Sequence, residues 1–207
     1  MKYVLIALLA LVTGCSEGGG GSSEAPPVPA PKTVTIFGDS LCYSSDTFDS
    51  WARRLNDVEG FEVNDLCIRG FRATYPIFAE TIINDTSDIF IMALGVNDAV
   101  GMLIGEDFAE LHGLTQQTID DYRLAYTKII GVALLNGSEV ICVLPPMTGA
   151  PWVQPMIPQI WGVIDDVCGD VGTLVHSAPS DALDEIHYAE YGDQQMYKIM
   201  LDALDNL

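Results

Sequence analysis

The 207-residue chain carries 29 acidic residues against 9 basic ones, for a formal net charge of −20, and 49% of its residues are hydrophobic. That hydrophobic content excludes an intrinsically disordered protein, and the acidic balance argues against nucleic acid as a partner, because such a surface repels phosphate backbones. The length is enough for one domain with a sizeable core.

The first 31 residues predict export and a lipid anchor. An apolar run over 3–12 follows Lys2 and is too short to span a membrane, but it has the length of a signal-peptide core. The end of this run and the residues after it, Leu-Val-Thr-Gly-Cys over 11–15, resemble a bacterial lipobox, in which Cys15 is lipidated. An ordinary cleavable signal is the alternative. Residues 16–31 are rich in Gly, Ser and Pro, as a tether is. We therefore expect three parts: a lipoprotein signal peptide over 1–14, a lipid-anchored linker over 15–31 and one domain over 32–207.

Strand-like and helical segments alternate along the expected domain. Short β-branched or continuously apolar runs predict strands at 33–37, 61–67, 88–94, 139–144 and 172–176. Helical spacing of apolar residues predicts helices at 48–58, 77–83, 118–135, 158–167 and 190–204. Strands separated by helices imply a parallel sheet covered on both faces. Ligands bind such sheets beyond the carboxyl ends of the strands.

The cysteines outside the lipobox show neither a CxxC motif nor a metal-ligand spacing; they are Cys42, Cys67, Cys142 and Cys168. An exported protein meets an oxidising compartment, where disulfides form. Cys42 and Cys67 follow the first two expected strands and are candidates for a pair. Buried free thiols are the alternative for all four.

A serine and a histidine are the first candidates for chemistry. Ser40 follows the first expected strand in Phe-Gly-Asp-Ser-Leu, and a serine hydroxyl needs a neighbouring base to act as a nucleophile. Taken alone, Asp-Ser after a strand is more often a helix cap. His187 has Asp184 three residues before it, whose carboxylate can accept from Nδ1–H and leave Nε2 free to take a proton. A lone DxxH pattern is weak, because it arises often by chance.

Two positions after other strands can stabilise an oxyanion. The Asn97 amide, in Gly-Val-Asn-Asp after the third strand, can donate to developing negative charge. Gly70, after the second strand, can present its backbone N–H closely because it lacks a Cβ. With the Ser40 N–H they would form a hole with three donors. A loop turn or a helix cap is the structural alternative for Asn97, and a turn is the alternative for Gly70.

The joint pattern resembles the GDSL/SGNH hydrolases. It consists of Phe-Gly-Asp-Ser-Leu, a glycine after the second strand, Gly-x-Asn-Asp, and Asp-x-x-His before a final helix. The resemblance implies a flavodoxin-like three-layer α/β/α sandwich around a five-stranded parallel sheet, and it requires no metal or cofactor. It also implies that Ser40 is the nucleophile and first oxyanion donor, that Gly70 and Asn97 complete the hole, that His187 is the base, and that Asp184 orients it.

The same resemblance implies a serine ester hydrolase working through an acyl-enzyme. We expect Asp39, Arg69 and Trp152 at the substrate pocket, where Arg69 can bind an acidic or sugar group and Trp152 can stack on a sugar or pack its own loop. Compact loops favour a short acyl chain, such as a carbohydrate O-acetyl group. The alternatives are a lysophospholipase or thioesterase, and an inactive carbohydrate-binding member. We expect a monomer in the cell envelope (outer membrane or periplasm in a Gram-negative cell), with small-molecule or carbohydrate esters as partners and membrane contact only through the anchor.

Overall fold

The computed structural model of the chain describes residues 29–45, 48–75, 81–104, 115–151, 153–177 and 187–207. The lipobox residue Cys15, the pocket candidate Trp152 and the proposed orienting residue Asp184 lie outside those ranges. Most of the helix expected at 77–83 also lies outside them. No helix within the described ranges is both long and apolar enough to cross a membrane.

Five parallel strands form one sheet in the order β2-β1-β3-β4-β5. The strands are β1 Lys32–Gly38, β2 Phe61–Cys67, β3 Ile89–Ala93, β4 Glu139–Leu144 and β5 Thr173–His176. Every residue of the central β3 is buried, as expected of a strand covered on both faces. This order is that of a flavodoxin-like sheet, whose switch point lies between β1 and β3.

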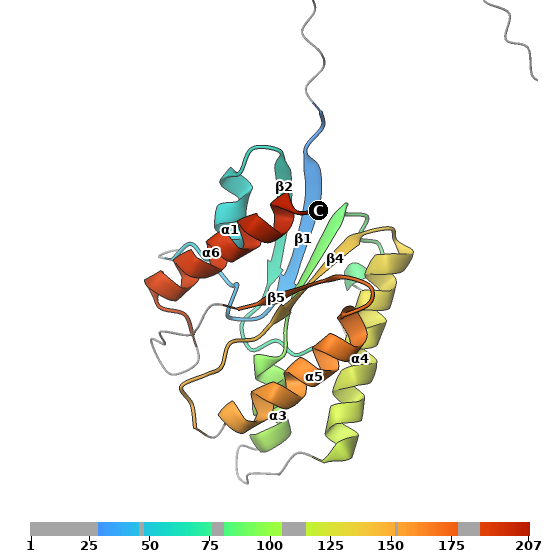
Figure 1. Cartoon of the computed structure of the whole chain (residues 1–207), viewed down its shortest axis with the longest axis vertical. Helices are drawn as coiled ribbons and strands as arrows, with labels where there is room; N and C mark the ends of the chain where they lie inside the picture. The colour runs from blue at the N-terminus through green and yellow to red at the C-terminus, as the bar shows by residue number, and fades with distance from the viewer. Residues whose placement is uncertain (1–28, 46–47, 76–80, 105–114, 152, 178–186) are drawn as a thin grey trace, which may run out of the picture.

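Helices cover both faces of the sheet (Figure 1). On one face lie α1 Trp51–Arg54 and α6 Glu190–Asp205, and on the other lie α3 Val96–Ile104, α4 Gln116–Leu135 and α5 Ile157–Cys168. Two short 3₁₀ turns complete the elements, η1 Leu55–Asp57 and η2 Gln154–Met156. The expected three-layer sandwich with five parallel strands is therefore confirmed.

Local sequence explains where the helices begin. The helix expected at 48–58 starts only at Trp51, because the Ser50 hydroxyl accepts from the Arg53 N–H and caps it. The helix α3 was not expected, and it places Asn97 in its first turn rather than in a loop. Its nine residues are almost continuously apolar after Asp98, so they show no helical spacing that would distinguish helix from strand.

All four described cysteines form disulfides, which decides between the two expectations. Cys42 bonds to Cys67, and Cys142 bonds to Cys168, with Cα–Cα distances of 5.7 and 6.5 Å. The first bond ties the loop after β1 to the end of β2. Gly38 is required beside it, since a Cβ there would lie 2.2 Å from the Cys42 sulfur.

Candidate active site

The register of the sheet brings three loops to one edge. Gly38, the last residue of β1, pairs with Cys67 on one side and with Ala93 on the other. The segments that follow the three strands therefore leave the sheet at the same level. They carry Ser40, Gly70 and Asn97, so the candidates found after separate strands lie around one site.

Ser40 contacts the histidine expected to serve as its base. The Ser40 Oγ lies 2.9 Å from the Nε2 of His187, which stands in the loop before α6. When the imidazole carries its proton on Nδ1, the hydroxyl donates to Nε2, which is the arrangement that general-base activation of a serine needs. Two residues 147 positions apart in the sequence are thus brought into hydrogen-bond contact.

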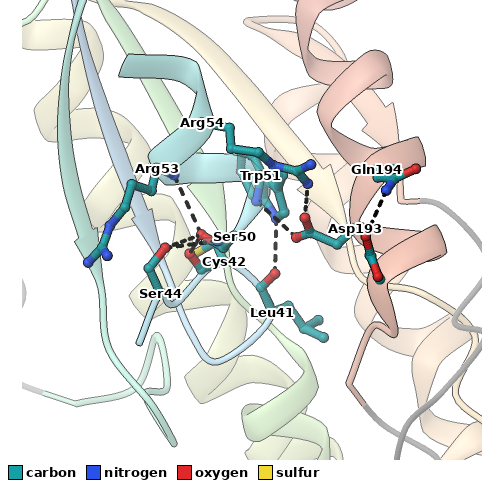
Figure 2. Close-up of polar contacts among 10 residues, drawn as sticks. Leu41, Cys42, Ser44, Ser50, Trp51, Arg53, Arg54, Asp193 and Gln194 are labelled. Carbon is teal, nitrogen blue, oxygen red and sulfur yellow. Dashed lines mark hydrogen bonds and ion pairs between the residues drawn. The ribbon is translucent and has the colours of Figure 1, made fainter. Parts of the chain in front are cut away.

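The loop that carries Ser40 is held from within and from α1. The Leu41 N–H donates to Asp39 Oδ1 at 2.9 Å, which fixes a tight turn around the serine. The indole Nε1 of Trp51 donates to the Leu41 carbonyl at 2.9 Å, and the Ser50 hydroxyl donates to the Cys42 carbonyl (Figure 2). Three side chains therefore fix the backbone directly after Ser40, at Leu41 and Cys42.

A buried acid joins this loop to the helix that follows the histidine. Asp193, in the first turn of α6, accepts from the Trp51 N–H at 2.9 Å and forms an ion pair with Arg54, and its side chain is 2% exposed (Figure 2). The segments bearing Ser40 and His187 are thereby held by one network. Sequence reasoning missed Asp193, because an acid in a first helical turn is explained by the helix dipole alone.

The two other oxyanion candidates, Asn97 and Gly70, line one cleft together with Ser40. The Asn97 Nδ2 is buried and makes no hydrogen bond of normal geometry within the described ranges, although the Asn97 amide lies close enough to the Asp39 carboxyl to lower its pKa. Gly70 lines the cleft that also contains Ser40 and Asn97, and it has a φ of 72°, a conformation that favours glycine. Their segments are tied together by Asp98, which accepts from the Ala73 N–H at 2.9 Å and from the Thr74 N–H at 3.3 Å. An unpaired buried donor beside a nucleophile is the feature that an oxyanion hole requires.

A cleft of about 520 Å³ opens above Ser40. Its described lining residues come from the loops after β1 and β2, from the start of α3, from the loop before α6 and from the first turn of α6. They are Ser40, Leu41, Tyr43, Ser45, Phe48, Arg69, Gly70, Asn97, His187, Tyr188 and Asp193. Arg69 is in this wall, as expected. Tyr43 and Phe48 were missed, because neither stands in a motif. Among the described residues no cluster of three or more His, Cys, Asp or Glu could hold a metal ion.

Asp39 lies beneath the cleft rather than in its wall. Its side chain is fully buried, and Oδ2 has no hydrogen-bond partner among the described residues. Burial raises the pKa of Asp39 to about 7; the Leu41 N–H opposes this rise, the nearby Asp98 carboxylate adds to it, and the Asn97 amide opposes it. Burial likewise raises the pKa of Asp98 to about 6, against the N–H groups of Ala73 and Thr74.

Replacing Asp39 with Asn is expected to flatten the pH dependence of stability. The native carboxyl holds its proton up to about pH 7, whereas the unfolded one has a pKa of 3.8, so the native state binds more protons between these values. Asp39 therefore contributes stability that is fully present below about pH 4 and is lost as the pH rises through 7, by a few kcal/mol.

Urea unfolding at pH 4.5, 5.5, 6.5 and 7.5 measures this effect. The free energy of unfolding of the wild type should fall relative to that of Asp39→Asn across the series. Asp202→Asn, which changes an exposed carboxylate on α6, is the matched control and should follow the wild type. An unchanged difference between wild type and Asp39→Asn at all four pH values would refute the assignment.

Comparisons with known proteins find similarity in structure alone. No protein-family model matches the chain, and neither does a curated protein. An acetylxylan esterase from Geobacillus stearothermophilus matches with a TM-score of 0.66 and 13% identity, over 86% of this chain and 95% of its own. An acetyl xylan esterase called AlAXEase matches with a TM-score of 0.69 and 15% identity, over 83% of this chain and 99% of its own.

These likenesses establish the fold, a three-layer α/β/α sandwich shared over nearly the full length of both esterases. Three of the matching Geobacillus structures are catalytic mutants of that enzyme. They replace a serine, a histidine and an aspartate with alanine. The fold and the serine-histidine contact described above thus agree with the class of protein that the sequence pattern resembles.

Proposed function

We propose that the protein is a serine esterase that removes short acyl groups, acetyl above all, from carbohydrates. The observation that carries the proposal is the 2.9 Å contact between Ser40 Oγ and His187 Nε2, in a cleft that also holds the Asn97 amide, whose buried Nδ2 makes no hydrogen bond of normal geometry within the described ranges. The structural neighbours are named as esterases of acetylxylan or of acetyl-xylooligosaccharides, and these names support an acetyl group as the acyl group and a sugar as the alcohol part of the substrate.

The mechanism follows from the chemistry of these groups. His187 Nε2 takes the hydroxyl proton as Ser40 Oγ attacks the ester carbonyl, and the negative charge develops on the carbonyl oxygen. The Asn97 amide and the backbone N–H groups of Ser40 and Gly70 donate to that oxygen. The protonated His187 gives its proton to the departing sugar alkoxide, and an acetyl-Ser40 remains. Water activated by His187 then releases acetate, while Asp184 orients the imidazole.

The space around the nucleophile supports a short acyl chain. Among the described residues, the void next to the Ser40 loop measures about 10 Å³ and is enclosed by side chains that include Asp39, Trp51 and Met196. That void has room for about one water molecule and none for a hydrocarbon chain. A long acyl chain would have to remain in the open cleft, where its methylene groups gain little burial free energy.

We expect kcat/KM for p-nitrophenyl acetate to exceed that for the decanoate by at least about tenfold, because the extra methylenes find no enclosed pocket among the described residues. A panel of acetate, butyrate and decanoate esters, acetylated xylo-oligosaccharides and a lysophospholipid measures the preference. The acetylated oligosaccharides should release acetate. Equal or faster turnover of the decanoate, or hydrolysis of the lysophospholipid alone, would overturn the proposal in favour of a lipase-like function.

A further inference from the structure

Arg69, in the wall of the cleft, has no carboxylate partner among the described residues. Of the other arginines, Arg53, Arg54 and Arg123 have carboxylate partners within the described ranges, which are Asp49, Asp193 and Asp166. Arg72 has no ion pair there either, but it is half-buried and near the Asp98 carboxylate, where its charge opposes the rise in the Asp98 pKa. No carboxylate in the described part of the chain lies within ion-pair distance of Arg69, although acidic residues outnumber basic ones 29 to 9. An exposed arginine without a carboxylate partner in so acidic a chain calls for a ligand.

The guanidinium of Arg69 is held in place by an aromatic ring. Its central carbon lies 4.9 Å from the centroid of the Tyr43 ring, and both side chains line the cleft that contains Ser40. Stacking of this kind orients the planar guanidinium and leaves its N–H groups at the edge free to donate. Such a fork matches the two oxygens of a carboxylate.

No acid among the described lining residues of the cleft neutralises this charge. Asp193 also lines the cleft, but it is 2% exposed and its oxygens are taken by Arg54 and the Trp51 N–H. Asp39 is fully buried below. Among the described lining residues, Arg69 is therefore the charge that a ligand meets beside the nucleophile. Because the chain as a whole carries a net charge of −20, an anionic ligand needs such a local cation to bind here.

We propose that Arg69 and Tyr43 form a subsite for a carboxylate, and that the substrate is an acetyl ester of a saccharide containing a uronic acid. The inference rests on the proposed function and names its substrate class. Arg69 binds the uronate while the acetyl group of the same saccharide lies at Ser40. The cleft of about 520 Å³ is within the size range of sites that hold ligands larger than a single acetylated sugar.

The test compares acetylated glycosides that differ only in charge. Mono-acetylated methyl glucuronoside, its uncharged methyl ester and the corresponding glucoside 6-sulfate are given to the full chain, and kcat/KM is measured from acetate release. The wild type should prefer the glucuronoside to its methyl ester by about fivefold, the upper range for an exposed ion pair. Added salt at 0.5 M should reduce that preference.

Three variants locate the preference. Arg69→Gln should bring the ratio to about one, and Tyr43→Leu should lower it, because the guanidinium loses its support. Arg123→Gln removes the same charge from α4, outside the cleft, and should leave the ratio unchanged. A ratio within one protein is insensitive to partial unfolding, so a merely structural role of Arg69 would not change it.

The outcomes separate the inference from the function it rests on. Equal hydrolysis of the charged and uncharged glycosides by wild type and Arg69→Gln overturns the subsite and leaves the esterase in place. A preference for the sulfated glycoside that disappears in Arg69→Gln overturns the assignment to a carboxylate. Absence of hydrolysis of every acetylated glycoside refutes the proposed function, and the subsite with it.

Discussion

Ser40→Ala is expected to lower kcat for p-nitrophenyl acetate by at least about 10⁴-fold, because no acyl-enzyme can form without the hydroxyl. His187→Ala should lose a comparable factor, since the Ser40 Oγ then lacks the base that lies 2.9 Å away. The double variant should be no worse than the poorer single variant, because groups that act as one unit are not additive. Steady-state kinetics on the four proteins measures all three effects.

Covalent labelling gives an independent readout of the same assignment. A fluorophosphonate should add to the wild type once, on the peptide that contains Ser40, and should not add to Ser40→Ala. Ser138→Ala is the matched control. The Ser138 hydroxyl donates to the Ser87 carbonyl at the amino ends of β3 and β4, away from the carboxyl ends that carry the site. That variant should keep its activity and its labelling. Full activity in Ser40→Ala, or labelling at another serine, would contradict the assigned nucleophile.

The layers of the fold could be predicted because the pattern of apolar residues along a segment indicates which of its faces are buried. The strand expected at 88–94 is a continuous apolar run, which in a parallel sheet means both faces covered, and β3 is buried throughout. The helix expected at 118–135 shows apolar residues at helical spacing, and α4 buries its face at Tyr122, Tyr126, Ile129, Ile130 and Ala133. Periodicity of this strength leaves few alternatives.

The pairing of Ser40 with His187 could be predicted only as a hypothesis. Each motif alone is explained by a cap or a chance spacing, and what made them informative was that each follows a strand of one parallel sheet. The register explains why Ser40 lies beside Gly70 and Asn97, since Gly38 pairs with both Cys67 and Ala93, whereas His187 reaches Ser40 from the loop before α6. Sequence separation is irrelevant once the carboxyl ends of the strands share an edge.

The contacts that hold the site were not predictable from sequence. Asp193, Trp51 and Tyr43 act through partners 142, 10 and 26 positions away, and no local pattern indicates such a partner. Asp39 was placed in the pocket because it precedes the nucleophile, yet it is fully buried. A side chain at a tight turn can point into the core or into the cleft, and packing of the whole molecule decides which.

Asn97→Ala is expected to lower kcat by about 10²- to 10³-fold with little change in KM. The amide donates to the carbonyl oxygen only as negative charge develops on it, so its loss affects the transition state more than the bound substrate. In the free protein the Asn97 Nδ2 is buried without a partner in the described ranges. Removing such a donor takes away a desolvation cost, so the thermal midpoint should stay the same or rise.

The combination of lower activity and undiminished stability distinguishes an oxyanion donor from a structural residue. Asn56→Ala is the matched control, because the Asn56 Oδ1 accepts from the Val63 N–H at 3.2 Å, away from the cleft. That variant should lose about 1 kcal/mol of stability and none of its kcat. A fall in the thermal midpoint of Asn97→Ala with unchanged kcat would assign Asn97 to the fold. The reverse result would mean that the protein carries an unpaired buried amide for its use in the transition state.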